Sequence, residues 1–418
     1  MARTMAIPAA PVDLERAAEL RKEMAYRLSQ DGCISSWFVR DAFSRVPREL
    51  FMPQGTPLED AYGEAVITKT STDGRNLSSV NNPWLQARMI GQAGLQPGMS
   101  VLEVGSGGCG VAVLADVVGP SGLVVSIDID PEITRRTLAC LDAAGYGGRV
   151  TVVTGDAEHG VPRLAPFDAI LVTGSAWDLP PAWRDQLAPG GTLVAPLRFN
   201  GVTRCLGLRR QGDHWVSNSA QACGLEPLGG LGAACGWQFV LSHPDGGRVR
   251  LVFEDRAPEV LRVDAGWLGA AATSAWTGVT IPHGGSFADL QLWLAGLRGF
   301  CRVNAEEGTQ LAGVPSSGRC RGWLPFGLVV GASLACLGLR PAAGASPSSY
   351  ELGAWAYGPD AKHAANVMAF AIERWDALTR TLPESAFAYW PNGTALGDLP
   401  AGSVAFSKRH GAATIAWA

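Results

Sequence analysis

The chain has little charge and no strong excess of either sign. Only 17% of its 418 residues are charged, and the formal net charge is −4. Proteins that bind nucleic acid or membrane surfaces usually carry a basic stripe or a polybasic arm, and this sequence contains neither. The composition therefore favours peptides or small molecules as partners over nucleic acid or lipid.

Regular spacings of metal ligands are also absent from the sequence. The nine cysteines include no CxxC pair and are odd in number, and the six histidines show neither HExxH nor HxxxH spacing. Zinc sites and disulfide frameworks depend on such spacings, so we expect no metal site and no disulfide framework. Most thiols are expected to be buried and unreactive, and Cys109, in a glycine-rich segment, either fills its loop or has a methyl-accepting or nucleophilic role.

Long apolar runs are missing as well. The longest run, residues 324–339, is interrupted by Gly327, Gly331 and Gly338 and is too short for a membrane span. Residues 1–11 have neither a basic start nor an apolar core, so we expect no secretory signal and a cytoplasmic location.

Glycine, by contrast, is abundant, and the most informative segment is Val101-Leu-Glu-Val-Gly-Ser-Gly-Gly-Cys-Gly110. Its apolar start predicts a strand, its glycines a tight turn, and the spacing in residues 110–118 a helix. The next apolar run ends at Asp128, where a carboxylate can accept the hydroxyl protons of an adenosine ribose. Since any tight strand-to-helix turn uses glycine, the motif alone also permits a purely structural role.

The spacing of the glycines narrows the class of ligand. From Gly105 the segment reads GxGGxG, whereas a pyrophosphate site would read GxGxxG. No lysine follows in the GK[ST] position that grips nucleotide phosphates. The sequence therefore predicts an adenosyl ligand and disfavours a dinucleotide or ATP.

The length and the order of apolar runs predict two domains. Strands that alternate with helices from residue 101 to residue 196 predict an α/β fold with a doubly wound parallel sheet. Beyond residue 236, predicted strands at 248–253 and 350–357 and a helix at 361–378 indicate an α+β unit. We therefore expect a ligand-binding domain over residues 1–235 and an accessory domain over residues 236–418.

Several segments in order resemble the protein-L-isoaspartate O-methyltransferase family, which are class I S-adenosylmethionine (SAM) methyltransferases. They are residues 46–53, 61–62, 80–83, 101–107, 125–128, 155–156, 167–173, 186–191 and 223–229. The resemblance implies a Rossmann-like sheet preceded by a helical segment, with SAM as methyl donor and S-adenosylhomocysteine as product. It places the methionine part of SAM near Gly105 and Gly107, the ribose at Asp128 and the adenine near Asp156. The implied cofactor contacts are Glu103, Gly105, Ser106, Gly107, Asp128, Ile129, Gly155, Asp156, Ala157 and Thr173.

The same resemblance exposes a departure on the substrate side. Family members have Ser-Gln-Pro before the glycine loop, whereas this chain has Asn81-Asn82-Pro83, preceded by Ser78 and Ser79. These four polar residues are candidate donors to the acceptor carboxylate, which is ionised at neutral pH and needs no general base. Alternatively they cap a helix that starts at Pro83. The polar segment 55–76 is expected to cover the pocket, or to be an ordinary surface loop.

The C-terminal half resembles methyltransferases encoded with lanthipeptides and related ribosomal peptides, described as the FxLD system. Residues 289–293, 358–360 and 408–410 carry this similarity. It implies methylation of an aspartyl side chain in a ring-constrained peptide, with the ester leading to aspartimide and isoaspartate, and peptide recognition by the C-terminal domain. The alternatives are repair of isoaspartyl residues in damaged proteins, and a non-catalytic subunit that binds SAM or peptide. The oligomeric state stays open.

Overall fold

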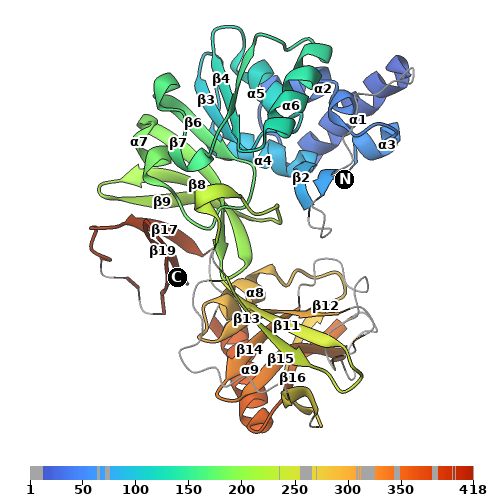
Figure 1. Cartoon of the computed structure of the whole chain (residues 1–418), viewed down its shortest axis with the longest axis vertical. Coiled ribbons are helices and arrows are strands. Elements are labelled where there is room, and N and C mark those ends of the chain that lie inside the picture. Colours follow the sequence, from blue (N-terminus) through green and yellow to red (C-terminus); the bar gives the residue numbers. More distant parts are fainter. Residues whose placement is uncertain are drawn as a thin grey trace.

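The computed structural model describes residues 13–63, 66–70, 76–234, 236–254, 266–269, 271–306, 309, 311, 325–342, 349–378, 385–397, 399–400 and 402–417. Figure 1 shows two sheets at opposite ends of the molecule, with the N-terminal helices beside the first. The α-helices are α1 (Leu14–Gln30), α2 (Trp37–Arg45), α3 (Leu58–Ala61), α4 (Pro83–Ala93), α5 (Gly110–Val118), α6 (Pro131–Ala143), α7 (Pro181–Asp185), α8 (Ala288–Ala295) and α9 (Ala361–Leu378). The 3-10 helices are η1 (Arg48–Phe51), η2 (Ala157–His159), η3 (Pro162–Leu164), η4 (Gly230–Gly232) and η5 (Trp267–Gly269).

The larger sheet is the predicted parallel sheet with an antiparallel extension. Its strands are β3 (Ser100–Val104), β4 (Leu123–Asp128), β5 (Val150–Thr154), β6 (Phe167–Val172), β7 (Leu187–Phe199), β8 (Val202–Gln211), β9 (His214–Ala222), β17 (Ala386–Pro391), β18 (Val404–Ser407) and β19 (Gly411–Ala416). Their order is β18-β19-β17-β9-β8-β7-β6-β3-β4-β5, and the strands from β7 to β5 run parallel. The α/β fold predicted from the sequence is confirmed.

Alternate residues of the parallel strands enter two different apolar clusters. Ala169 and Leu171 of β6 belong to a cluster shared with α1, α2, α4 and α5. Ile170 and Val172 belong to the cluster on the opposite face, with Trp183 of α7. Because successive side chains on a strand point to opposite faces, this sheet is buried on both sides. The near-continuous apolar runs in the sequence follow from that double burial.

The second sheet is antiparallel throughout its described pairings. Its strands are β10 (Trp237–Ser242), β11 (Arg248–Phe253), β12 (Thr273–Pro282), β13 (Phe300–Ala305), β14 (Phe326–Val330), β15 (Ser333–Pro341) and β16 (Ser349–Tyr357), in the order β10-β11-β13-β14-β15-β16-β12. Helix α9 contacts β12, β15 and β16. Its bounds match the helix predicted for residues 361–378.

The last strands of the chain depart from the expected division at residue 235. Strands β17, β18 and β19 return to the larger sheet, where β17 pairs with β9. Without them β9 would present an edge of unpaired backbone groups, so their return completes the sheet. The buried Tyr389 of β17 also donates a hydrogen bond of 2.6 Å to Asp178. Pairing between strands about 170 residues apart leaves no local signal in the sequence.

The described part of the chain contains no helix that is long and apolar enough to cross a membrane. In the same residues, no group of three or more histidine, cysteine, aspartate or glutamate side chains is arranged to hold a metal ion. The described cysteines are free thiols.

We predict that Tyr389→Phe destabilises the protein. The change removes a buried hydrogen bond to a carboxylate, which typically contributes about 1–3 kcal/mol to the free energy of unfolding. Urea unfolding of the variant and the wild type measures the difference. Tyr26→Phe, at a tyrosine that is 63% exposed, is the matched control, and an equal effect of both changes would contradict the assigned bond.

Candidate functional site

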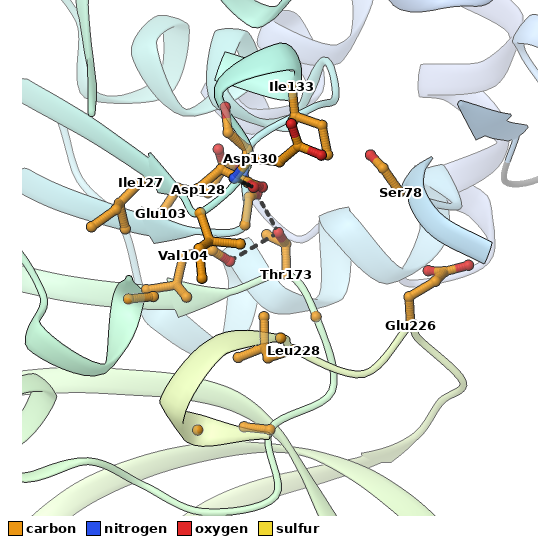
Figure 2. A pocket seen from close by; sticks show the side chains of 18 of the residues that line it. Ser78, Glu103, Val104, Ile127, Asp128, Asp130, Ile133, Thr173, Glu226 and Leu228 are labelled. Carbon is orange, nitrogen blue, oxygen red and sulfur yellow. Dashed lines mark hydrogen bonds between the residues drawn. The ribbon is translucent and has the colours of Figure 1, made fainter. Parts of the chain in front are cut away.

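A pocket of about 240 Å³ opens at the carboxyl ends of β3, β4 and β6 (Figure 2). The chain passes from β3 to β4 and β5 on one side, then returns to pair β6 with the other side of β3. Such a reversal of strand order leaves a crevice outside the strand ends, where doubly wound sheets bind ligands. The pocket therefore lies where this fold most readily holds a small molecule.

Two glycines shape the loop that follows β3. Gly105 and Gly107 have φ values of 95° and 138°, which side chains rarely adopt. A Cβ atom at Gly105 would lie 2.7 Å from Oγ1 of Thr173, and one at Gly107 would lie 3.0 Å from Oγ of Ser78. The loop thus needs glycine at both positions for its conformation and for its close contact with two other pocket segments.

Asp128 ends β4 beside this loop. Its carboxylate accepts hydrogen bonds from the backbone N–H of Ser106 at 3.0 Å and of Asp130 at 2.9 Å. Burial raises its pKa to about 6. Asp128 also lines the pocket, so the carboxylate both fixes the loop and faces any ligand. This arrangement fits the ribose of an adenosyl group, whose hydroxyls would donate to it.

Glu103 of β3 is a buried acid on the wall of the pocket. It is 3% exposed and accepts a hydrogen bond of 2.7 Å from Ser126. Burial raises its pKa to about 8, and the negative charge of Asp128 adds to the effect. A buried carboxyl group without a cation holds its proton, whereas a cation nearby favours the charged form. This acid suits a ligand with an ammonium group, such as the amino-acid part of SAM.

The opposite wall of the pocket includes Asp156 and Glu158. Asp156 accepts hydrogen bonds from the N–H groups of Glu158 and Leu231, each at 2.9 Å. Nε2 of His410, in the turn between β18 and β19, lies 2.8 Å from a carboxylate oxygen of Glu158. The C-terminal strands therefore support this wall, which the resemblance assigns to the adenine.

Two of the four polar candidates, Ser78 and Ser79, lie on a small hairpin of β1 (Val66–Thr70) and β2 (Asn76–Val80), and Asn81 and Asn82 join β2 to α4. Lys69 of β1 contacts Asp130 and Glu132 at 2.6 Å each, and so ties the hairpin to the start of α6. The segment expected to cover the pocket, residues 55–76, thus contains a strand; its residues 64–65 and 71–75 lie outside the described part of the chain.

The four candidate donors have different bonding. The Ser78 hydroxyl accepts a hydrogen bond of 3.0 Å from Thr68, and no residue that the structure describes accepts its own hydrogen, which can therefore be donated to a ligand. Ser79 lies 3.0 Å from both Asn81 and Glu226, and the Asn81 amide donates to the Thr173 carbonyl at 3.0 Å. Ser78, Ser79 and Asn81 all line the pocket.

Three predicted contact residues lie behind the pocket wall. Asn82 is the N-cap of α4, where its side chain accepts from the N–H of Trp84, so the capping alternative is correct for this residue. Gly155 donates through its backbone to Asp128, and the Gly107 carbonyl accepts from Arg136. These residues support the site without lining it. The other implied cofactor contacts do line the pocket: Glu103, Gly105, Ser106, Asp128, Ile129, Asp156, Ala157 and Thr173.

Cys109 lies beneath the glycine loop and is 2% exposed. Burial raises the pKa of its thiol, which opposes a nucleophilic role. The buried Arg48 lies 3.2 Å from its sulfur and donates to the carbonyls of Ala61 and Asn81. Arg48 therefore links Ala61, Cys109 and Asn81, of which Asn81 lines the pocket.

Sequence reasoning gave no role to several residues that line the pocket. They are Leu77, Gln86, Asp130, Ile133, Glu158, Asp178, Trp183, Glu226 and Leu228. Glu226 and Leu228 fall in the segment 223–229 that carries the resemblance, so the signal was present without an assigned role. The others come from separate elements, and only the folded chain brings them together.

We predict that Glu103 makes the stability of the ligand-free protein depend on pH. Its raised pKa means that the folded state keeps a proton from about pH 4.5 to pH 8 that the unfolded state releases, so stability falls as pH rises through this window. Glu103→Gln stays neutral and loses this contribution. The wild type minus variant difference in unfolding free energy should decline with pH by at most about 1.4 kcal/mol per unit. Thermal and urea unfolding at several pH values measure it, and a difference constant with pH would contradict the assignment.

Comparison with known proteins gives the family. The family model for Protein-L-isoaspartate(D-aspartate) O-methyltransferase (PCMT) matches residues 19–230. A protein-L-isoaspartate O-methyltransferase of Hyperthermus butylicus is 39% identical over 201 residues, which cover 44% of this chain and 78% of that protein. One of Ignicoccus hospitalis is 37% identical over 188 residues, or 43% of this chain and 82% of that protein.

A solved structure titled protein-L-isoaspartate O-methyltransferase has a similar fold. It matches with a TM-score of 0.50 at 20% identity and covers 90% of this chain and 98% of its own. This likeness extends beyond the family model into the second sheet. From the family model and the relatives, the chain belongs to the protein-L-isoaspartate(D-aspartate) O-methyltransferase family and is a SAM-dependent carboxyl O-methyltransferase.

Proposed function

We propose that the enzyme methylates the side-chain carboxylate of an aspartyl residue in a ring-constrained, modified ribosomal peptide. The product ester leads to aspartimide and isoaspartate. Asn81 and Asn82 stand where the family has Ser-Gln before the proline, and this difference supports a methyl acceptor other than an isoaspartyl residue. The resemblance of the C-terminal half to enzymes of the FxLD system supplies the class of peptide.

The observation that carries carboxylate methylation is the hydroxyl group of Ser78. Ser78 lies in the pocket wall and is 9% exposed. Its oxygen accepts a hydrogen bond from Thr68, and its hydrogen has no acceptor within the described residues. A hydroxyl donor in a pocket with little water favours a bound carboxylate, because the donor replaces a hydrogen bond lost from water. Ser78 is therefore our candidate to receive the acceptor.

The acid-base demands of the reaction are small. SAM supplies an electrophilic methyl group, and an aspartyl carboxylate is already ionised at neutral pH. The chain must orient the carboxylate oxygen, exclude water and compensate for the lost hydration. The glycine loop and the Lys69 contacts hold the pocket rigid, and Ser78 supplies the hydrogen bond.

We assign recognition of the folded peptide to the region beyond the family-matched residues. The antiparallel sheet from β10 to β16 lies entirely outside residues 19–230. Its chain continues into β17–β19, whose His410 and Tyr389 contact Glu158 and Asp178 of the pocket wall. A peptide bound by this region would therefore be held by a part of the chain that is continuous with the methyl-transfer site.

A second candidate is repair of isoaspartyl residues in proteins. The relatives of Hyperthermus butylicus and Ignicoccus hospitalis carry the name protein-L-isoaspartate O-methyltransferase, and the residues that match the family model include the glycine loop and Asp128. An isoaspartyl residue also presents an ionised carboxylate, so Ser78 could serve either acceptor.

We expect methyl transfer to a thioether-cyclised peptide with aspartate in its ring, and little transfer to the linear peptide or to a linear isoaspartyl peptide. Purified protein, SAM and each peptide are incubated, and mass spectrometry follows the gain of a methyl group and the later loss of methanol. Preference for the linear isoaspartyl peptide would replace our first proposal with repair. No transfer to any of the three peptides would contradict both.

We also predict different effects of two neighbouring substitutions. Ser78→Ala removes the proposed donor and should lower kcat by roughly 10- to 100-fold, as for loss of one transition-state hydrogen bond, and it should cost about 1 kcal/mol of stability because Thr68 loses its acceptor. Asn82→Ala removes a helix cap and should cost about 1 kcal/mol of stability with kcat unchanged. Steady-state kinetics and urea unfolding of both variants check this. The reverse pattern would exclude Ser78 as the donor.

A further inference from the structure

The Ser79 hydroxyl, in the wall of the pocket, faces two hydrogen-bond acceptors with a single hydrogen. The Ser79 oxygen lies 3.0 Å from Oδ1 of Asn81 and 3.0 Å from Oε2 of Glu226. A serine hydroxyl carries a single hydrogen, so Ser79 can donate to only one of these two oxygens. The oxygen of Asn81 or Glu226 that receives no hydrogen then faces a lone pair of the Ser79 oxygen.

The neighbouring contacts do not remove this mismatch. The Asn81 amide nitrogen donates to the Thr173 carbonyl at 3.0 Å, which turns its oxygen toward Ser79. Ser79 is the only donor to the Glu226 side chain, and no arginine, lysine or histidine pairs with that carboxylate in the described part of the chain. An outside donor at Glu226 would leave Ser79 free to satisfy Asn81.

The backbone holds Glu226 firmly in this position. The N–H of Ser175 donates to the Glu226 carbonyl at 2.8 Å, and the N–H of Leu228 donates to the Ser175 carbonyl at 3.0 Å. These bonds attach the segment to the loop after β6. Figure 2 shows Glu226 and Ser78 at the same end of the pocket, apart from Ile127 and Glu103.

Ser78 and Glu226 can make complementary hydrogen bonds with a peptide that accepts the methyl group. Ser78 has a hydrogen to donate, and Glu226 has an oxygen to accept with. A peptide acceptor carries a carboxylate and, a few bonds away, the N–H groups of its own backbone. An acceptor with a second carboxylate at this point would meet the negative charge of Glu226 at short range.

We propose that Glu226 is a specificity-determining residue that accepts a hydrogen bond from a backbone N–H next to the methylated residue and rejects acceptors with a neighbouring acidic side chain. This inference rests on the proposed carboxylate methylation. It adds substrate specificity to the site, because the Glu226 carboxylate binds a backbone N–H of the peptide while Ser78 binds the carboxylate that is methylated.

The test combines a substitution in the protein with a methyl group on the peptide. The probes are the cyclised aspartyl and the linear isoaspartyl peptide, each also made with N-methyl groups at the two amides flanking the acceptor residue. For the wild type, one N-methyl group should raise KM about tenfold with kcat little changed, as for loss of one uniform binding contact. In Glu226→Ala the same N-methyl group should have no effect, since its partner is gone.

Charge is tested with Glu226→Gln and a peptide that has glutamate beside the acceptor. The wild type should use this peptide at least about tenfold less well, by kcat/KM, than the alanine counterpart. Glu226→Gln keeps an acceptor oxygen but loses the charge, so it should lose most of this discrimination and keep the response to N-methylation. Glu373→Ala, on the exposed face of α9, is the control for a lost surface carboxylate.

The possible outcomes separate the two proposals. Equal N-methyl penalties in the wild type and Glu226→Ala, or unchanged discrimination in Glu226→Gln, overturn the role of Glu226 while methylation itself stands. Binding of SAM, measured by calorimetry, should be the same in all variants, and its loss would show that the substitution damaged the pocket and that Glu226 has a structural role instead. A wild type that methylates none of the peptides contradicts the proposed function.

Discussion

The close approach of the glycine loop to the strand end at Thr173 is the constraint on which the site depends. Gly105 has a positive φ angle that residues with a side chain rarely adopt. It also lies so near Thr173 that a Cβ atom at residue 105 would collide with the Thr173 hydroxyl group. Oγ1 of Thr173 lies 2.6 Å from the Gly105 carbonyl and 3.0 Å from the Val104 carbonyl, and the Thr173 backbone carbonyl accepts from Asn81. The cofactor side and the acceptor side of the pocket thus share one rigid backbone junction, and a displaced loop would disturb both.

Burial of acids is the second physical theme of the pocket. Glu103 and Asp128 lie where removal from water raises the pKa of each carboxyl group. A ligand that brings a positive charge and hydroxyl donors compensates this cost, whereas an anionic ligand would add to it. The other end of the pocket differs, because it holds both the Ser78 hydroxyl and the Glu226 carboxylate. The pocket therefore separates groups suited to the methyl donor from groups suited to a peptide carboxylate.

The C-terminal strands connect the rest of the chain to this pocket. Strands β17–β19 complete the larger sheet, and their turn places His410 against Glu158. The apolar cluster on that face continues from Leu193 and Phe199 into Leu290, Leu337 and Met368 of the second sheet and its helices. One apolar cluster thus contains residues of both sheets.

The sequence by itself determined the parallel sheet, the glycine loop and the acid at the end of β4, because each is encoded locally in apolar runs, glycine spacing and one strand-end carboxylate. It also predicted α9 and named Ser78, Ser79 and Asn81 as candidate donors to an acceptor carboxylate, and these three residues line the pocket. Only the tertiary structure decided that Asn82 caps a helix, that the Ser78 hydrogen has no acceptor within the described residues and that Glu226 reaches the same end of the pocket. It likewise decided that the last strands return to the first sheet. These features depend on contacts between residues far apart in the chain, and such contacts leave no periodic pattern in the sequence.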